Sequence, residues 1–310
     1  MMIKIIKYFI IFMIFSLITV INSNSSENKI LLKVNNEIIT SLDILNEYEY
    51  LQIINKELRN IKIEEAFKIS KNSIIKEKIK QIEIKRVIKE IKVDEKVIDN
   101  LLLNYFKEFK ILSMSDFKNF FLSKNINPNF VRKKIKLEIL WNQLIYQKYK
   151  QNVKIDKHLI IDDLKKNDKK SEFLISEILF NVNENENLNE KFNEIKKSIK
   201  EISFSQSALT YSIADTSNKG GKLGWISESI LSKQIYNKLI NLTVGEHTEP
   251  ILVPGGFLIL KLLDTRKITK SFDINKEVKR IVDEKTNQQL NRFSNIYFNK
   301  VKKDIAIDEL

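Results

Sequence analysis

The sequence predicts an α+β protein with a mainly helical N-terminal module, a smaller inserted unit containing a sheet, and a C-terminal helix. Apolar residues recur at helical spacing over residues 41–166 and again over 273–302. Between these regions, three of the six glycines fall within residues 220–224, and short apolar runs typical of strands flank them at 173–182 and 248–263. A chain of 310 residues has room for two domains of this kind.

Composition narrows the class of function. The formal net charge is +13, but acidic residues are interspersed among the lysines, so we interpret the charge as a solvated surface and expect no nucleic-acid partner. Cysteine is absent, which excludes disulfides and thiol chemistry. No phosphate-loop, dinucleotide or zinc-binding spacing is found, so no cofactor is expected. The acidic residues Asp162, Asp163, Glu184 and Glu186 lack the spacing of a calcium loop, so no metal is expected.

The first 23 residues read as an export signal. Lys4 and Lys7 precede an uncharged apolar run over residues 8–21, and small polar residues follow it. The run is shorter than the roughly 20 apolar residues of a spanning helix and is typical of a signal peptide. Two alternatives remain: a cleaved signal with a mature chain that starts between Asn24 and Lys29, or a retained anchor that keeps the protein at the membrane.

Residues 28–170 are expected to form the helical module. Ile30–Val34 and Glu37–Thr40 are expected as strands joined by a turn, and Ser41 is expected to cap the first helix. Further helices are expected over 64–91, from Asp94 to 106, from Ser115 to 121, from Pro128 onward, and from Asp156 to about 166. The long helix after Pro128 carries a buried stripe of Leu137, Leu140, Trp141, Leu144 and Ile145. The charged segment Lys165–Ser171 is expected to be a linker.

Residues 172–268 are expected to form the inserted unit, in the order β-α-α-α-β-β. The expected strands are 173–182, 248–253 and 257–263, and the expected helices are 188–202, 204–211 and 229–240. Gly220, Gly221 and Gly224 mark a turn in which a side chain would not fit. After this unit, residues 271–310 are expected to give one long helix, Asp273–Lys302, and a short strand at Ile305–Ile307. The apolar stripe of that helix is too long to be buried on the small unit alone, so we expect it to pack on the N-terminal helices.

Two stretches resemble known families. Tyr211-Ser212, Gly220-Gly221-Lys222-Leu223-Gly224-Trp225, Gly245-Glu246, Glu249-Pro250 and Gly256 follow one another in an order that resembles the parvulin (PpiC-type) peptidyl-prolyl isomerases. The opening Val34–Ser41 resembles that of the SurA-type periplasmic chaperones. This resemblance implies a periplasmic protein whose C-terminal helix and strand complete the N-terminal module. The chain departs from the best-known members, which carry two parvulin repeats, because only one is found here.

The resemblance also assigns site positions. Active parvulins carry a His, a Cys or Asp, and a second His, and these positions fall on Glu177, Ile213 and Leu258, with Asp215 two residues beyond Ile213. The chain's two histidines, His158 and His247, lie elsewhere and are interpreted as surface residues. The proline pocket positions are apolar, and two aromatic residues are candidates for the same peptide groove; the full set is Leu231, Ile235, Ile240, Phe257 and Trp225.

Three functions follow from these expectations. The first is an ATP-independent periplasmic chaperone that binds unfolded outer-membrane or exported proteins and aromatic-rich peptides, with a parvulin-like domain that is weak or inactive as an isomerase. The alternative is a catalytically active peptidyl-prolyl cis-trans isomerase that assists the folding of exported proteins. The third is a membrane-tethered chaperone, if the signal is retained. Whether the chain is an enzyme stays open here, because both histidine positions of the family are replaced.

Overall fold

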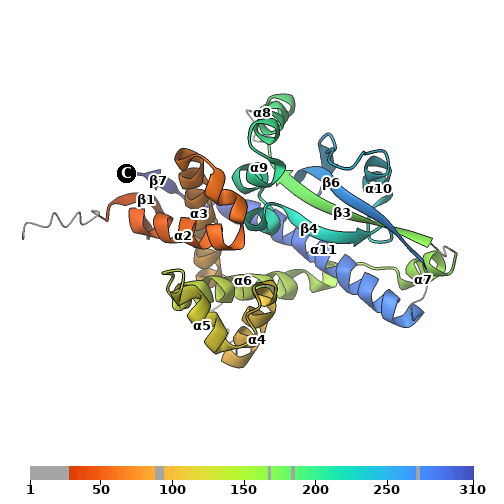
Figure 1. Ribbon diagram of the computed structural model, residues 1–310, viewed down its shortest axis with the longest axis horizontal. Coiled ribbons are helices and arrows are strands. Elements are labelled where there is room, and N and C mark those ends of the chain that lie inside the picture. The colour runs from red at the N-terminus through yellow and green to blue at the C-terminus, as the bar shows by residue number, and fades with distance from the viewer. Residues whose placement is uncertain (1–27, 88–93, 167–168, 183–185, 270–272) are drawn as a thin grey trace, which may run out of the picture.

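The computed structural model describes residues 28–87, 94–166, 169–182, 186–269 and 273–310. The expected signal segment, residues 1–23, lies outside the described residues. The α+β class is confirmed: helices fill the N-terminal part, a sheet follows, and a long C-terminal helix returns past both (Figure 1). None of the described helices is both long enough and apolar enough to cross a bilayer.

A three-stranded antiparallel sheet joins the two ends of the described chain. It has the order β2 (Glu37–Thr40), β1 (Ile30–Val34) and β7 (Ile307–Glu309). Leu32 pairs with Glu309 and Val34 with Ile307, so the C-terminal strand lies beside the N-terminal one. It spans Ile307–Glu309 and not the expected Ile305–Ile307, whose first two residues lie before the strand. Two hydrogen bonds fix the corner: the Asn35 N–H donates to the Ala306 carbonyl at 2.9 Å, and the Ala306 N–H donates to the Asn35 side-chain oxygen at 2.9 Å.

Two helix caps differ from the expected ones. The cap of α2 (Ser41–Ile54) is Thr40 and not Ser41: the Thr40 side chain accepts from the Asp43 N–H, and the Thr40 N–H donates to the Asp43 carboxylate at 2.8 Å. The cap of α5 (Met114–Leu122) is Ser113 and not Ser115, because Asp116 closes the same reciprocal pair. Asp94 caps α4 (Glu95–Tyr105) and Asn127 caps α6 (Pro128–Tyr149), which agrees with the expected helix starts at Asp94 and Pro128. The remaining helices of this part are α3 (Ile63–Val87) and α7 (Lys157–Lys166), and the expected end of α3 at Ile91 lies outside the described residues.

The helical part has two cores. Phe106, Phe117 and Phe121 are fully buried where α2, α4, α5 and α6 meet. The second core surrounds Trp141 of α6 and includes side chains from β1, α3 and the last helix, α11 (Ile274–Lys303). Tyr297, Phe298 and Val301 of α11 are buried in this second core, so the C-terminal helix completes it.

Residues 169–269, here called the sheet unit, form a four-stranded antiparallel sheet in the order β4-β3-β6-β5. Its strands are β3 (Lys169–Phe180), β4 (Lys222–Ser227), β5 (Ile251–Val253) and β6 (Gly256–Thr269), and its helices are α8 (Leu188–Glu201), α9 (Phe204–Tyr211) and α10 (Lys233–Leu239). Strand β4 was not expected. The expected linker Lys165–Ser171 is corrected as well, because its described residues belong to α7 and to the first residues of β3.

The glycine turn brings two backbones into contact. The Glu177 N–H of β3 donates to the Gly221 carbonyl at 2.8 Å. Gly221 has a φ of +76°, and a Cβ there would lie 2.1 Å from the Glu177 carbonyl oxygen. A neighbouring Cβ on Gly220, at φ +69°, would lie 1.9 Å from the Ser205 Oγ. Only glycine fits at both positions, which explains the Gly-Gly pair.

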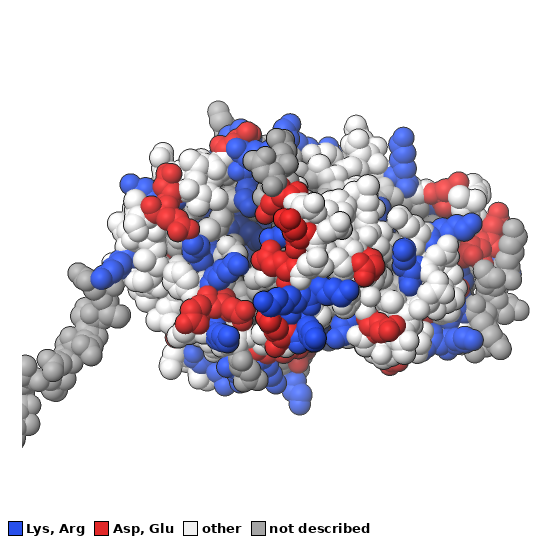
Figure 2. Space-filling view, turned by 90° about the horizontal axis from the view of Figure 1, so that it is seen from above, with Lys and Arg blue, Asp and Glu red and all other residues white. Residues whose placement is uncertain are grey.

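Side chains alternate between the two faces of the sheet, as a strand requires. Ile178 and Phe180 of β3 face α8 and α9, where they are buried with Phe192 and Ile195. Ile175 and Leu179 face the opposite way, toward α10 and its buried Ile235 and Leu239. Figure 2 shows Lys and Arg side chains intermingled with Asp and Glu on the face it presents, which agrees with a solvated mixture of charges.

Candidate peptide-binding cleft

A cleft of about 270 Å³ lies between the sheet unit and α11. Its floor is apolar and comes from β3, β4, β6, α10 and the segment before α10. Its opposite wall is polar and comes from one stretch of α11. The floor includes Ile175, Leu179, Leu223, Leu231, Ile235, Leu258 and Leu260, and the wall includes Glu284, Asn287, Gln288, Asn291, Arg292 and Asn295.

Helix α11 is anchored on both sides of this wall. Toward its start, Ile281 is fully buried with Ile160 and Leu164 of α7 and with Ile230 of the sheet unit. Toward its end, Tyr297 and Phe298 are held in the core around Trp141. The tip of the β5–β6 hairpin also lies against the helix, because a Cβ on Gly255 would be 3.6 Å from the Asn295 Cβ. The helix therefore crosses the mouth of the cleft as a supported wall.

The structure brings some of the expected site residues together and leaves others apart. Glu177, Leu231, Ile235 and Leu258 all line the cleft. Ile240 ends α10 with 53% of its surface exposed and does not line it. Phe257 lies on the other face of the sheet, where its ring is 5.8 Å from that of Phe180.

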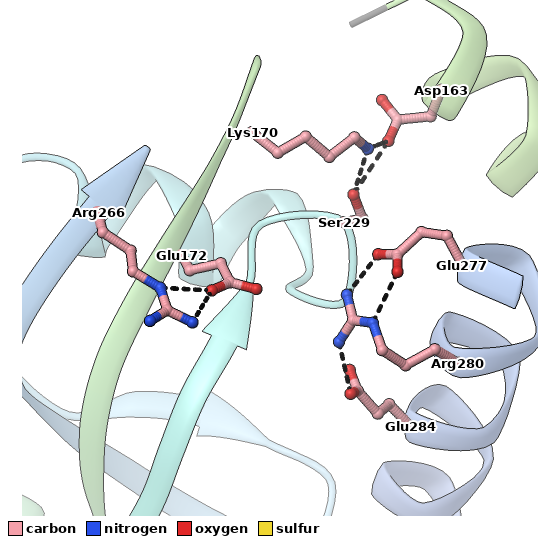
Figure 3. Close-up of polar contacts among 8 residues, drawn as sticks. All are labelled: Asp163, Lys170, Glu172, Ser229, Arg266, Glu277, Arg280 and Glu284. Atoms are coloured by element: carbon pink, nitrogen blue, oxygen red, sulfur yellow. Dashed lines mark hydrogen bonds and ion pairs between the residues drawn. The ribbon is translucent and has the colours of Figure 1, made fainter. Parts of the chain in front are cut away.

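Trp225 is likewise absent from the lining of the cleft. Its ring pairs with the guanidinium of Arg266 at 4.2 Å, and Arg266 forms an ion pair of 2.6 Å with Glu172 on the neighbouring strand. Figure 3 shows Arg266 and Glu172 side by side across β3 and β6, which are paired in register at these residues. This cross-strand contact accounts for Trp225 as a residue that stabilises the sheet.

Glu177 stands at the first histidine position of the resemblance, and its carboxylate accepts a hydrogen bond from the Thr216 hydroxyl at 2.8 Å. Burial raises the pKa of Glu177 from its usual value to about 7; the Thr216 hydrogen bond opposes this shift and the nearby Asp215 charge adds to it. A carboxyl with this pKa exchanges a proton near neutral pH. It is the one titratable group among the three family positions Glu177, Ile213 and Leu258.

The other polar candidate, Asp215, is bound to the helical part of the chain. Ile213 packs on the core of the sheet unit, and its N–H donates to the Leu179 carbonyl at 2.7 Å. Asp215 accepts from the Lys80 ammonium of α3 at 3.0 Å, and Lys80 also donates to Glu138 of α6 at 2.7 Å. Asp215 is therefore held by an ion pair to the helical part of the protein and does not line the cleft.

A second hollow, of about 320 Å³, lies at this contact between α3, α6 and the residues that follow α9. Lys76 of α3 enters the contact and donates to the Ser212 carbonyl at 2.8 Å, and burial lowers the pKa of Lys76 to about 8. Nearby, the Gln206 amide donates to the Glu57 carbonyl at 3.0 Å. These polar and charged groups thus contribute to the docking of the sheet unit on the helices.

The remaining candidates play no part in the cleft. His158 is exposed, and the Nδ1 of the half-buried His247 lies 3.1 Å from the Thr248 carbonyl. Over the described ranges, no three His, Asp or Glu side chains converge in a way that would hold a metal ion.

Comparison with known proteins now identifies the sheet unit. Residues 177–264 match the family model described as Rotamase, the PPIC-type PPIASE domain. The chain carries a PpiC-type parvulin domain. The expected resemblance to this family is confirmed, and the matched residues contain the glycine turn, all of the floor of the cleft except Ile175, and all three family positions.

The chain is also distantly similar to SurA and SurA-like chaperones. Chaperone SurA of Pseudomonas putida is 24% identical over 166 residues, which cover 50% of this chain and 39% of that protein. Chaperone SurA of Pseudomonas aeruginosa is 40% identical over 63 residues, 20% of this chain and 15% of that protein. The chain thus matches less than half the length of these curated relatives.

Two solved structures are also similar. A structure from the study of PEB4 and Cj1289, two SurA-like chaperones of Campylobacter jejuni, is 18% identical, covers 91% of this chain and 99% of its own, and has a TM-score of 0.36. A PpiC-type peptidyl-prolyl cis-trans isomerase domain is 30% identical over 33% of this chain and 96% of its own, with a TM-score of 0.28.

Proposed function

We propose that this protein is an exported, ATP-independent chaperone that holds unfolded client segments in the cleft beside its parvulin domain. The observation that carries the proposal is the lining of the cleft. Leu231, Ile235 and Leu258 form an apolar floor, and Leu258 and Ile213 offer no hydrogen bond where the family pattern has polar groups. Such a floor suits the apolar side chain of an unfolded segment and gives little help to a twisting amide.

The proposed clients are inferred from the relatives. Proteins named as SurA and SurA-like chaperones are similar to parts of this chain. We therefore propose unfolded outer-membrane and other exported proteins as clients. The proposed location is the periplasm, with residues 1–23 as the signal. We also propose that 28–170 and 271–310 form one folding unit into which 172–268 is inserted, which is supported by the burial of Tyr297 and Val301 around Trp141.

The test is a pair of assays on the full-length mature chain. Light scattering follows the aggregation of an unfolded outer-membrane β-barrel protein diluted from urea without ATP. The second assay measures the rate of cis-trans isomerisation of a proline-containing tetrapeptide. The proposal expects a clear delay of aggregation and an isomerisation rate close to the uncatalysed one. Unchanged aggregation in the presence of the chaperone would refute it.

Active isomerisation is a second candidate, and one observation favours it. Glu177 lies in the cleft with a pKa raised to about 7, so a neutral carboxyl is present below that pH and can donate a hydrogen bond to a peptide amide. An enzyme of this kind would lose activity as the pH rises through about 7. It would also lose activity in the Glu177→Ala variant.

A further inference from the structure

The α11 wall of the cleft carries a ladder of carboxamides. Asn287, Asn291 and Asn295 follow one another at intervals of four residues, and Gln288 lies beside them; all four line the cleft. Asn287 and Asn291 are exposed, and none of the four side chains forms a hydrogen bond with any described part of the chain. Each carboxamide offers two donors and one acceptor. The wall therefore has hydrogen-bonding capacity that the fold itself does not use.

A buried acceptor without a donor on the same wall also indicates that a ligand binds there. Figure 3 shows Arg280 between Glu277 and Glu284 on one side of α11. Glu284 accepts from Arg280 through Oε1 at 2.6 Å, whereas its Oε2 is buried and has no donor among the described residues. Buried polar atoms normally have a partner, and an orphan requires an explanation. A donor on a bound ligand would supply the missing partner.

The spacing of the ladder matches an extended peptide. Residues four apart on an α-helix are separated by about 6 Å along its axis. Alternate residues of an extended chain are separated by about 6.6 Å. A strand that lies along α11 therefore presents one equivalent backbone amide to each of Asn287, Asn291 and Asn295. The mismatch over the whole ladder is about 1 Å, which side-chain rotation can absorb.

We infer that α11 is the backbone-binding wall of the parvulin cleft. Asn287, Asn291 and Asn295 hydrogen-bond the main chain of an extended peptide, and an apolar side chain of that peptide enters the floor at Leu231 and Leu258. The inference rests on the proposed function of the cleft and adds a second part of the chain to it. Because main-chain groups are the same in every peptide, this wall binds clients of many sequences, and the parvulin domain by itself lacks half of the site.

The experiment uses the full-length mature chain and one defined probe. The probe is a fluorescein-labelled nine-residue peptide of alternating leucine and serine with a central proline, and anisotropy gives its Kd. The triple variant Asn287→Ala, Asn291→Ala, Asn295→Ala is expected to weaken binding about tenfold to a thousandfold, since each lost hydrogen bond weakens binding about two- to tenfold. The matched control is Asn299→Ala, which removes the same group from α11 outside the cleft and is expected to leave Kd unchanged.

A second probe separates a direct contact from a general effect on structure. The same peptide with its leucine amides N-methylated cannot donate from those positions. It is expected to bind the wild type at least tenfold more weakly than the parent peptide and to bind the triple variant about as well as the parent does. If the triple variant fails to fold by circular dichroism, the exposed Asn291→Ala substitution is compared with the two peptides in the same way.

The outcomes distinguish the two proposals. Loss of binding in Leu231→Asp together with wild-type affinity in the triple variant would overturn the role of α11 and leave the proposed cleft standing. The role of α11 would also be overturned if N-methylation of the peptide weakened its binding to the wild type and to the triple variant by the same factor. A wild-type protein that does not bind the parent peptide would overturn both proposals.

Discussion

Trp141 of α6 donates its indole N–H to the Ser294 hydroxyl of α11 at 2.8 Å, and both residues are buried. The two are separated by more than 150 positions in the chain. This contact ties the C-terminal helix to the centre of the second helical core. It also fixes the rotation of α11, and with it the face that the helix turns toward the parvulin cleft.

The first prediction concerns this hydrogen bond. Ser294→Ala leaves the indole N–H without a partner in a dry core and should lower the free energy of unfolding by about 1–3 kcal/mol. Urea unfolding followed by circular dichroism measures the change. The matched control is Ser115→Ala on α5, an exposed serine, which should change stability by less than about 0.5 kcal/mol. Equal effects of the two substitutions would show that the Trp141 contact contributes nothing.

A second prediction concerns removal of α11 and β7. A chain truncated after residue 270 loses Tyr297, Phe298 and Val301 from the core around Trp141, and it should lose much of its helical stability. The chain's two tryptophans report separately, because Trp141 lies in this core and Trp225 lies in the parvulin sheet. In single-tryptophan variants, Trp141 emission should shift to the red on truncation while Trp225 emission stays in place. A Trp141 spectrum that does not change would argue against the shared folding unit.

Much of this arrangement follows from sequence. The cap at Asp273 and the apolar stripe of α11 predict a long helix with a hydrophobic face, and that face must be buried somewhere. Strand β4 was not predicted because Gly220 and Gly221 precede it and Gly224 lies within it. These glycines interrupt the alternation of apolar and polar residues that marks a strand. The choice between Thr40 and Ser41 as a cap depends on Asp43, which forms the reciprocal pair of cap hydrogen bonds with Thr40 and not with Ser41.

The cleft was predicted only in part. Leu231, Ile235 and Leu258 were identified through the family resemblance, because the floor lies within one continuous stretch of the parvulin domain. The wall was missed, because Asn287, Asn291 and Asn295 read as the solvated face of an amphipathic helix. The repeat of one residue type at intervals of four was the available signal. The ion pair between Lys80 and Asp215 was invisible for a different reason, since 135 positions separate its partners and charged residues are common throughout the chain.

The third prediction follows from the raised pKa of Glu177. The folded pKa of about 7 lies above the ordinary value of 4.5, so the folded state binds the proton more tightly than the unfolded state. The contribution to stability is therefore fully present below about pH 4.5 and is lost as the pH rises through about 7. Glu177→Gln mimics the neutral form. It should lie within about 1 kcal/mol of the wild type at pH 5 and be more stable at pH 8, by up to about 3 kcal/mol.

Thermal unfolding of both proteins from pH 5 to pH 8 tests this sign. Asp215 and Thr216 are the groups that act on Glu177, and both are the same in the two proteins, so the difference between the two proteins reports Glu177 itself. A stability difference that is constant over this range would show that Glu177 titrates as an ordinary surface carboxyl.

A fourth prediction concerns the contact between the parvulin domain and the helices. Burial opposes the charge of Lys80, but Asp215 and Glu138 outweigh it, so the pKa of Lys80 is raised above its ordinary value. The double variant Asp215→Asn, Glu138→Gln leaves a buried ammonium without a counter-charge and should cost about 3–5 kcal/mol. The triple variant that adds Lys80→Met removes the unpaired charge and should recover most of that loss. Differential scanning calorimetry measures both, and failure of Lys80→Met to recover stability would contradict the role assigned to this ion pair.

The most direct test of the proposed function is the aggregation of an unfolded outer-membrane β-barrel protein, followed by light scattering without ATP. The wild type and Glu177→Gln should delay aggregation equally, because the cleft holds a client through its apolar floor and does not need the titrating carboxyl. Leu231→Asp, checked for its fold by circular dichroism, should lose most of the delay, because it places a charge on that floor. Full protection by Leu231→Asp, or loss of protection in Glu177→Gln alone, would contradict a chaperone that works by holding clients in this cleft.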